Sequence, residues 1–291
     1  MTIASQVANE ETLRIEPLSA ILGARLEGID LSQDISEENA GLMRDALARH
    51  TVLCFPAQKI SGDDQIRFAR VFGKADADFV GKPTMHDKPA DDGPAKRGVL
   101  FISNLKQDGK NIGALPDGEL HFHSDGAHRK SPYRATTLYA IRIPSVGGET
   151  KFAHLGAAWD ALDAGMQQRI ENLKVQNVYD TRAHLRSQTN ETDETLSNAI
   201  HPIVRTHPDT GRKSLYLSRL MTRCIVDMPR AESDALLDIL FDHIEQPQFI
   251  YAHPWALDDL LIWDNRSVNH ARNDFPAQQE RHMRRVTVSE P

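Results

Sequence analysis

The chain has 291 residues, of which 40% are hydrophobic and 26% charged, and its formal net charge is −7. These values are ordinary for a globular protein of one large domain or two small ones, and the acidic balance argues against a nucleic-acid partner, which needs a basic face. No apolar run approaches the length of a membrane span, the first residues lack the apolar core of a secretory signal, and two cysteines do not make a disulfide framework. We therefore expect a cytoplasmic protein without a membrane partner.

Short apolar runs predict strands along the whole chain, at 51–55, 99–103, 136–143, 214–218, 260–263 and 285–288. Apolar residues at helical spacing predict three helices: one that starts near Ser61, one that carries a stripe from Trp159 to Leu173, and one over 236–244 that Pro247 ends. Cys54 lies within the first strand, where we expect a small buried hydrophobic residue.

The strands do not alternate regularly with helices, which favours a double-sheet jelly roll over a doubly wound parallel sheet. The predicted fold is mixed but mainly β, a double-stranded β-helix with flanking helices, and residues 1–291 are expected to form a single domain. Two polar stretches, around 74–98 and 181–198, predict long loops that act as lids over a site.

The most informative motif is His123-Ser124-Asp125. A histidine and a carboxylate two residues apart on a strand point to the same face, and His270 from a distant strand can complete a set of three ligands. Two histidines and one carboxylate, with the other positions open, form the ligand set of non-haem Fe(II) oxygenases. A second copy, His207-Pro208-Asp209, runs into Thr210-Gly211 and predicts only a hairpin turn.

Arginines near the end of the chain fit the same chemistry. An oxygenase of this kind needs an electron-donating co-substrate such as a 2-oxo acid, whose far carboxylate calls for a permanently charged partner. Arg281 and Arg285 share one face of the last predicted strand, and Arg284 takes the other. The alternative at this point is a solvated, basic strand.

Taken together, these motifs resemble the taurine dioxygenase and phenoxyacetate dioxygenase (TauD/TfdA) family over nearly the whole chain. The matching blocks are 23–30, 68–73, 123–125, 144–150, 201–208, 263–266 with His270, and 281–287. The resemblance implies an Fe(II)- and 2-oxoglutarate-dependent dioxygenase that uses O2 to hydroxylate a small anionic organic substrate, with release of succinate and CO2. Hydroxylation can in turn lead to cleavage of the substrate. It also implies a homo-oligomer.

The resemblance assigns roles residue by residue. It makes His123, Asp125 and His270 the iron ligands and catalytic residues. Arg281 and Thr150 match the residues that bind the distal carboxylate of 2-oxoglutarate, and Arg285 matches the one that holds the anionic group of the substrate.

Departures from the taurine-oxidising pattern concern the substrate. Asp78 stands where those enzymes have a histidine, Gly81 replaces a tyrosine, Glu119 replaces an asparagine, and Phe122 replaces a tryptophan. We therefore do not expect taurine as the substrate, and Asp78 and Glu119 become candidate substrate-binding residues. Asp264 and Asn265 are expected to support the metal strand through hydrogen bonds.

Two other functions stay open. A zinc hydrolase would use His121, His123 and Asp125 with a bound water, and a non-enzymatic jelly-roll protein would only bind its ligand. The zinc hydrolase leaves Arg281, Thr150 and Arg285 unexplained. The sequence does not separate structural from substrate-facing roles for His128 and His154, and His121 is a ligand, a support for a ligand or a surface residue.

Overall fold

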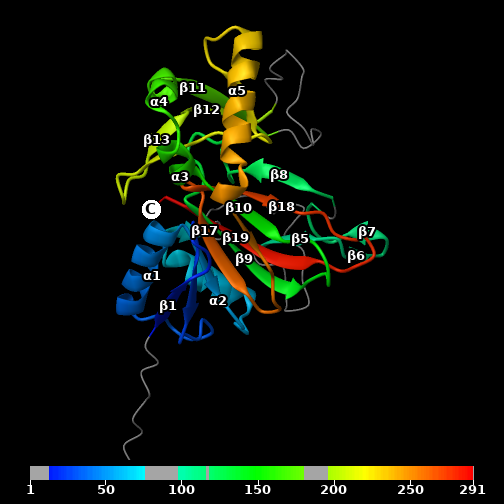
Figure 1. Cartoon of the computed structure of the whole chain (residues 1–291). Coiled ribbons are helices and arrows are strands. Elements are labelled where there is room, and N and C mark those ends of the chain that lie inside the picture. Colours follow the sequence, from blue (N-terminus) through cyan, green and yellow to red (C-terminus); the bar gives the residue numbers. More distant parts are fainter. Residues whose placement is uncertain (1–12, 76–97, 116–117, 180–195, 291) are drawn as a thin grey trace, which may run out of the picture.

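The computed structural model describes residues 13–75, 98–115, 118–179 and 196–290. Most strands belong to two sheets, and helices lie on the outside of both (Figure 1). This mainly β architecture with flanking helices is the one predicted. The two predicted lid loops fall almost wholly outside the described residues, as does Asp78, so their roles stay predictions.

The larger sheet has eight strands, and strands at its centre are buried on both faces. In spatial order it contains β1 (Arg14–Pro17), β2 (Ala24–Glu27), β3 (Val52–Phe55), β17 (Leu260–Asp264), β9 (Ala135–Arg142), β19 (His282–Ser289) and β4 (Lys74–Ala75), with β5 (Leu100–Ser103) also paired to β19. Along β3, Leu53 and Phe55 face one hydrophobic core and Cys54 faces another. This two-sided burial explains why the central strands are apolar throughout rather than alternating.

Two helices cover the first of these faces, α1 (Glu37–His50) and α2 (Gly62–Arg70). Ser61 caps α2 in the predicted capping box with Asp64. The helix α1 was not predicted, although Ser36 caps it and Ala40, Met43 and Leu47 form its buried stripe.

The smaller sheet packs against the other face and carries the residues of the predicted site. Its order is β16 (Ile250–His253), β10 (Thr150–His154), β18 (Val268–Arg272) and β8 (Leu120–His123). Phe152 on β10 contacts Trp263 on β17, with ring centroids 5.4 Å apart. The two sheets therefore share one core between them.

The remaining elements form a lobe beyond the smaller sheet (Figure 1). They include α3 (Leu155–Asp160), α4 (Ala164–Ile170), α5 (Arg230–Ile244), η2 (Pro247–Phe249), the sheet of β12 (Asn198–Pro202), β11 (Lys174–Val178) and β15 (Thr222–Ile225), and the hairpin of β13 (Val204–Thr206) and β14 (Lys213–Leu215). A separate small hairpin joins β6 (Lys106–Gln107) to β7 (Lys110–Asn111).

Two sequence predictions are modified in this lobe. The predicted helix from Trp159 to Leu173 is two helices, because the side chain of Asp163 accepts a hydrogen bond from the backbone N–H of Met166 and starts α4 anew. The strand predicted at 214–218 is shorter and lies at 213–215, where it forms the predicted hairpin with β13. Within the described ranges, no helix combines the length and apolarity that crossing a membrane requires.

Candidate active site

Strand pairing brings the predicted ligand residues together. His123 on β8 lies directly opposite His270 on β18, and their ring centroids are 4.1 Å apart. Asp125 follows β8 with Oδ1 at 3.9 Å from Nε2 of His123 and Oδ2 at 3.8 Å from Nε2 of His270. One nitrogen or oxygen from each residue lies within 4.8 Å of the others, and all three side chains are buried.

Hydrogen bonding decides which nitrogen of His123 is free. Its Nδ1 lies 2.9 Å from the carbonyl oxygen of His121, which can only accept, so Nδ1 carries the proton and the lone pair of Nε2 faces Asp125. A metal-bound histidine commonly makes this second bond to a backbone carbonyl. Burial, with the nearby charge of His123, lowers the pKa of His270 to about 3, and burial also lowers the pKa of His123. Both rings are therefore neutral at neutral pH.

Both carboxylate oxygens of Asp125 are held in place. Thr136 donates a hydrogen bond to Oδ2 at 2.7 Å, and Arg285 Nη1 lies 3.2 Å from Oδ1. Asn265 in turn donates to Thr136 at 2.9 Å. Burial acts to raise the pKa of Asp125, but Arg285 and the two histidines outweigh it and hold this pKa well below its ordinary range.

The supporting residues were only partly predicted. Asp264 supports the turn as expected, because its Oδ1 accepts the backbone N–H of Arg266 at 2.8 Å, and Asn265 reaches the site through Thr136. Thr136 was missed, because a second threonine, Thr137, stands beside it on β9 and the sequence does not separate the two.

Arg281 is a buried cation beside the glycine turn before β10. Its side chain donates from Nε to the carbonyl oxygen of Gly148 at 3.2 Å, and the residue is 2% exposed. Among the described residues no carboxylate forms an ion pair with it. Burial, with a smaller effect of Arg272, lowers its pKa to about 9. Gly148 has φ 73°, and a Cβ there would lie 3.3 Å from Cδ and Nε of Arg281.

Thr150 is the first residue of β10, shortly after that turn. It is buried, and its Oγ1 accepts a hydrogen bond from Nε1 of Trp255 at 3.1 Å. The hydroxyl proton therefore remains available to a further acceptor. Trp255 was not predicted as part of the site.

The two other arginines of the last strand differ as predicted. Arg285 faces Asp125 and its side chain stays 21% exposed. Arg284 takes the opposite face, where it donates to Gln65 and to the carbonyl oxygen of Ile60 and stacks over Tyr139.

The remaining predicted residues do not join the cluster of ligand atoms. Glu119 is exposed, with Oε1 3.7 Å from Nζ of Lys151. His121 contributes its carbonyl oxygen rather than a ring nitrogen. His154 caps α3, which is a structural role. His128 packs against Tyr179, and burial, with Arg129, lowers its pKa to about 4.

Comparisons with known proteins agree with this geometry. The model of the family described as taurine catabolism dioxygenase TauD, TfdA family matches residues 14–287. The alpha-ketoglutarate-dependent 2,4-dichlorophenoxyacetate dioxygenase of Cupriavidus pinatubonensis is 31% identical over 283 residues, which are 94% of this chain and 96% of that protein. An alkylsulfatase of Acinetobacter baylyi is 31% identical over 291 residues, 96% of this chain and 86% of that protein.

Solved structures give the same result. A crystal structure of AAD-2 in complex with Mn(II) and N-oxalylglycine has a TM-score of 0.79 at 30% identity and covers 96% of this chain and 98% of its own. A taurine dioxygenase from Burkholderia xenovorans has a TM-score of 0.79 at 26% identity, with 96% and 90% covered. These matches confirm the predicted jelly roll. The chain belongs to the TauD/TfdA family and is an Fe(II)- and 2-oxoglutarate-dependent dioxygenase.

Proposed function

We propose that His123, Asp125 and His270 hold the ferrous ion, and that the enzyme hydroxylates a small organic anion while 2-oxoglutarate is converted to succinate and CO2. The observation that carries this proposal is the convergence of one ligand atom from each of these buried residues within 4.8 Å. The bound iron supplies O2 activation and oxidation of a C–H bond, and the protein supplies orientation and shielding.

The donor set fits ferrous iron. Two neutral imidazoles and one ionised carboxylate form the facial set that leaves positions open for a co-substrate and O2. The deprotonated Nε2 of His123 already faces the carboxylate, so that ring needs no change of tautomer to bind a metal. All three side chains are buried, which keeps bulk water from the reacting atoms.

Arg281 and Thr150 are proposed to bind the distal carboxylate of 2-oxoglutarate. An isolated guanidinium is costly to bury, and a carboxylate that forks onto it removes that cost. The Thr150 hydroxyl adds a second donor because its own acceptor lone pair is occupied by Trp255. The carbonyl of Gly148 fixes the direction of the arginine through Nε.

Arg285 is proposed to bind the anionic group of the substrate, because its guanidinium is partly exposed and lies against the metal-ligand carboxylate. An organic carboxylate or a sulfate ester is the substrate class we favour, since the relatives named above act on 2,4-dichlorophenoxyacetate and on alkyl sulfates. Contacts of Asp78 and Glu119 with the substrate stay predictions, and so do the single domain, the homo-oligomer and the cytoplasmic location.

The zinc-hydrolase alternative is less well supported. It requires a ring nitrogen of His121 in the cluster, whereas the cluster contains His270 and only the backbone of His121 contacts His123. A protein that only binds its ligand is equally disfavoured by membership of the dioxygenase family.

An anaerobic titration tests the proposal. Adding Fe(II) and then 2-oxoglutarate to the purified chain is expected to produce the visible charge-transfer band of the chelate, and a panel of aryloxy carboxylates, sulfonates and alkyl sulfates is then screened for changes in that band. Compounds that perturb it are expected to stimulate succinate formation in air. No band in the wild type, or an unchanged band in His123→Ala, contradicts the assignment.

A further inference from the structure

A second group of buried metal-ligating side chains lies apart from the proposed iron ligands. Cys54 on β3, His253 at the end of β16 and Asp259 just before β17 each offer one ligand atom, and these atoms lie within 4.8 Å of one another. Their exposed fractions are 1%, 3% and 4%. The three residues come from both sheets, because β3 and β17 belong to the larger sheet and β16 to the smaller.

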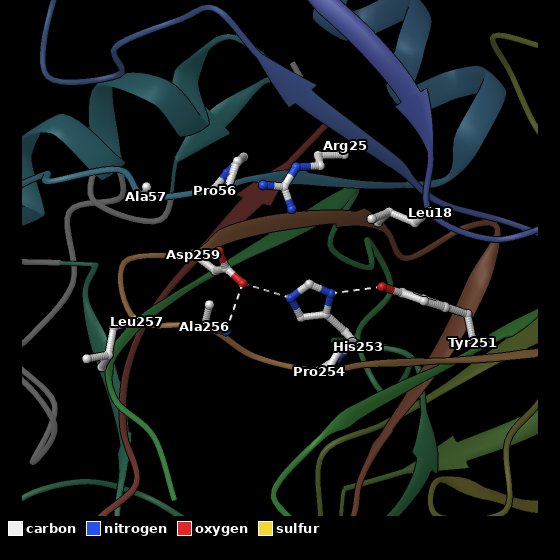
Figure 2. Close-up of a pocket in the computed structure, with 10 residues that line it drawn as sticks. All are labelled: Leu18, Arg25, Pro56, Ala57, Tyr251, His253, Pro254, Ala256, Leu257 and Asp259. Atoms are coloured by element: carbon white, nitrogen blue, oxygen red, sulfur yellow. Dashed lines mark hydrogen bonds and ion pairs between the residues drawn. The ribbon is translucent and has the colours of Figure 1, made fainter. Parts of the chain in front are cut away.

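The histidine ring is held on both sides. Its Nε2 lies 3.2 Å from Oδ2 of Asp259, and its Nδ1 lies 3.0 Å from the hydroxyl of Tyr251 (Figure 2). Asp259 is fixed as well, since Oδ2 also accepts the backbone N–H of Ala256 at 2.9 Å. A metal ion would replace the contact between Nε2 and Asp259, while Tyr251 holds Nδ1 as the second nitrogen of metal-bound histidines is typically held.

A pocket of about 280 Å³ opens beside this group. Its lining includes Leu18, Arg25, Pro56, Tyr251, His253 and Asp259 (Figure 2). His253 and Asp259 line this pocket, which gives them a route to solvent and has room for one more small ligand. Arg25 pairs mainly with Glu27, with Nε 2.6 Å from its carboxylate, and its charge also acts on Asp259.

We propose that Cys54, His253 and Asp259 form a second divalent-metal site, suited to zinc, with a water from the pocket as its fourth ligand. Thiolate, imidazole and carboxylate are the donor types that zinc takes in tetrahedral sites. A thiolate also distinguishes this site from the two-histidine, one-carboxylate set, because soft sulfur favours zinc over ferrous iron.

The proton and charge balance supports the site. Burial, with the charge of Asp259, raises the pKa of the Cys54 thiol to about 12, so the thiol is protonated without metal. Metal binding releases that proton, while the imidazole stays neutral by moving its own proton to Nδ1, which then donates to Tyr251. A divalent ion with one thiolate, one carboxylate and one neutral ring carries no net charge, which suits a buried position.

Cobalt(II) titration of the chelator-treated full chain tests the site under anaerobic conditions. Cobalt reports a thiolate ligand through an intense near-ultraviolet charge-transfer band and tetrahedral geometry through strong visible bands. We expect both in the wild type and in His123→Ala, which lacks a proposed iron ligand. Both bands are expected to disappear in Cys54→Ser and to persist in Cys224→Ser, the matched control at the other cysteine of the chain.

The outcomes of this titration can be distinguished from a failure of the proposed iron site. Wild-type protein that binds cobalt without a thiolate band overturns the second site and leaves the iron assignment untouched. A band that persists in Cys54→Ser also overturns it, and so does a band lost in Cys224→Ser. The wild-type spectrum alone is decisive if Cys54→Ser fails to fold, and Asp259→Asn then serves as the second variant, expected to weaken cobalt binding.

Discussion

The chain contains two His-x-Asp motifs, and the structure uses them in opposite ways. At the first, His123 and Asp125 converge with a third residue, and Nε2 of His123 lies 3.9 Å from Oδ1 of Asp125, too far for a hydrogen bond. At the second, Nε2 of His207 lies 2.9 Å from Asp264, and its Nδ1 accepts the backbone N–H of Asp209 at 3.1 Å. Every polar atom of that ring is used within the fold.

The same contrast holds for the arginines nearby. Arg266 donates to both oxygens of Asp264 at 2.9 and 2.7 Å, whereas Arg281 has no ion pair within the described part of the chain. Arg266 belongs to a buried cluster whose charges match internally, which stabilises the fold, whereas the unmatched charge of Arg281 indicates a ligand site. The motif alone does not distinguish the two.

The largest expected difference separates the two histidines. His123→Ala should abolish Fe(II) binding and turnover of 2-oxoglutarate while the chain still folds, because a metal ligand is lost. His207→Ala should keep both, and should lower the free energy of unfolding by roughly 1–3 kcal/mol, because the buried Asp264 loses a donor. Metal content, succinate formation and denaturant unfolding measure these effects. Turnover retained in His123→Ala would contradict the different roles assigned to the two histidines.

Replacement of the two arginines should change the stability of the protein in opposite directions. Arg281→Met removes an unpaired buried cation, so we expect a higher melting temperature together with a loss of roughly 2–5 kcal/mol in N-oxalylglycine binding. Arg266→Met leaves Asp264 without its main partner, so unfolding should become easier by roughly 3–5 kcal/mol with N-oxalylglycine affinity retained. Calorimetry of the metal-loaded protein measures both. A fall in stability for Arg281→Met contradicts the unmatched-charge argument.

Adjacent threonines on β9 sharpen the comparison further. Thr136→Val removes the donor to Asp125, and metal affinity is expected to fall roughly 10- to 100-fold, as for other residues that orient metal ligands. Thr137→Val is the matched control, because Thr137 is also buried but bonds to Gln65 and to the carbonyl of Val286. Titration with Co(II) on a Cys54→Ser background isolates the proposed iron site. Equal affinities in the two variants would remove the positioning role of Thr136.

The smallest effect concerns two glycines with nearly the same backbone. Gly148 has φ 73° and Gly211 has φ 70°, but only at Gly148 would a Cβ meet other atoms, Pro144 at 2.9 Å and Arg281 at 3.3 Å. Alanine at either position should cost about 1–2 kcal/mol of backbone strain. Only Gly148→Ala should also raise the KM for 2-oxoglutarate several-fold, by displacing Arg281. Equal KM values in the two variants would show that the absence of a Cβ at Gly148 does not position Arg281.

Local sequence patterns predicted the elements that local chemistry determines. The strands at 52–55, 135–142 and 260–264 and the capped helix α2 were predicted because apolar runs, turns and caps are read within a few residues. The Asp163 cap that divides the predicted second helix is also local, but a continuous apolar stripe concealed it.

The support of the site depends on long-range pairing and was harder to predict. Thr136 reaches Asp125 only because β9 packs beside β17 and Asn265, and Trp255 reaches Thr150 from the connection after β16. No spacing in the sequence encodes such contacts. Glu119 was proposed from its place relative to the motif, but the structure shows an exposed side chain near Lys151.

The edge position of β8 has a further consequence. This strand borders the smaller sheet with only β18 beside it, and their ladder shifts register between His270 and Arg272. An ion bound by both His123 and His270 links β8 to β18 in addition to the backbone hydrogen bonds between the two strands. Amide hydrogen exchange over residues 120–125 should therefore slow when the metal is bound. Exchange in this edge strand then reports whether the metal site is occupied.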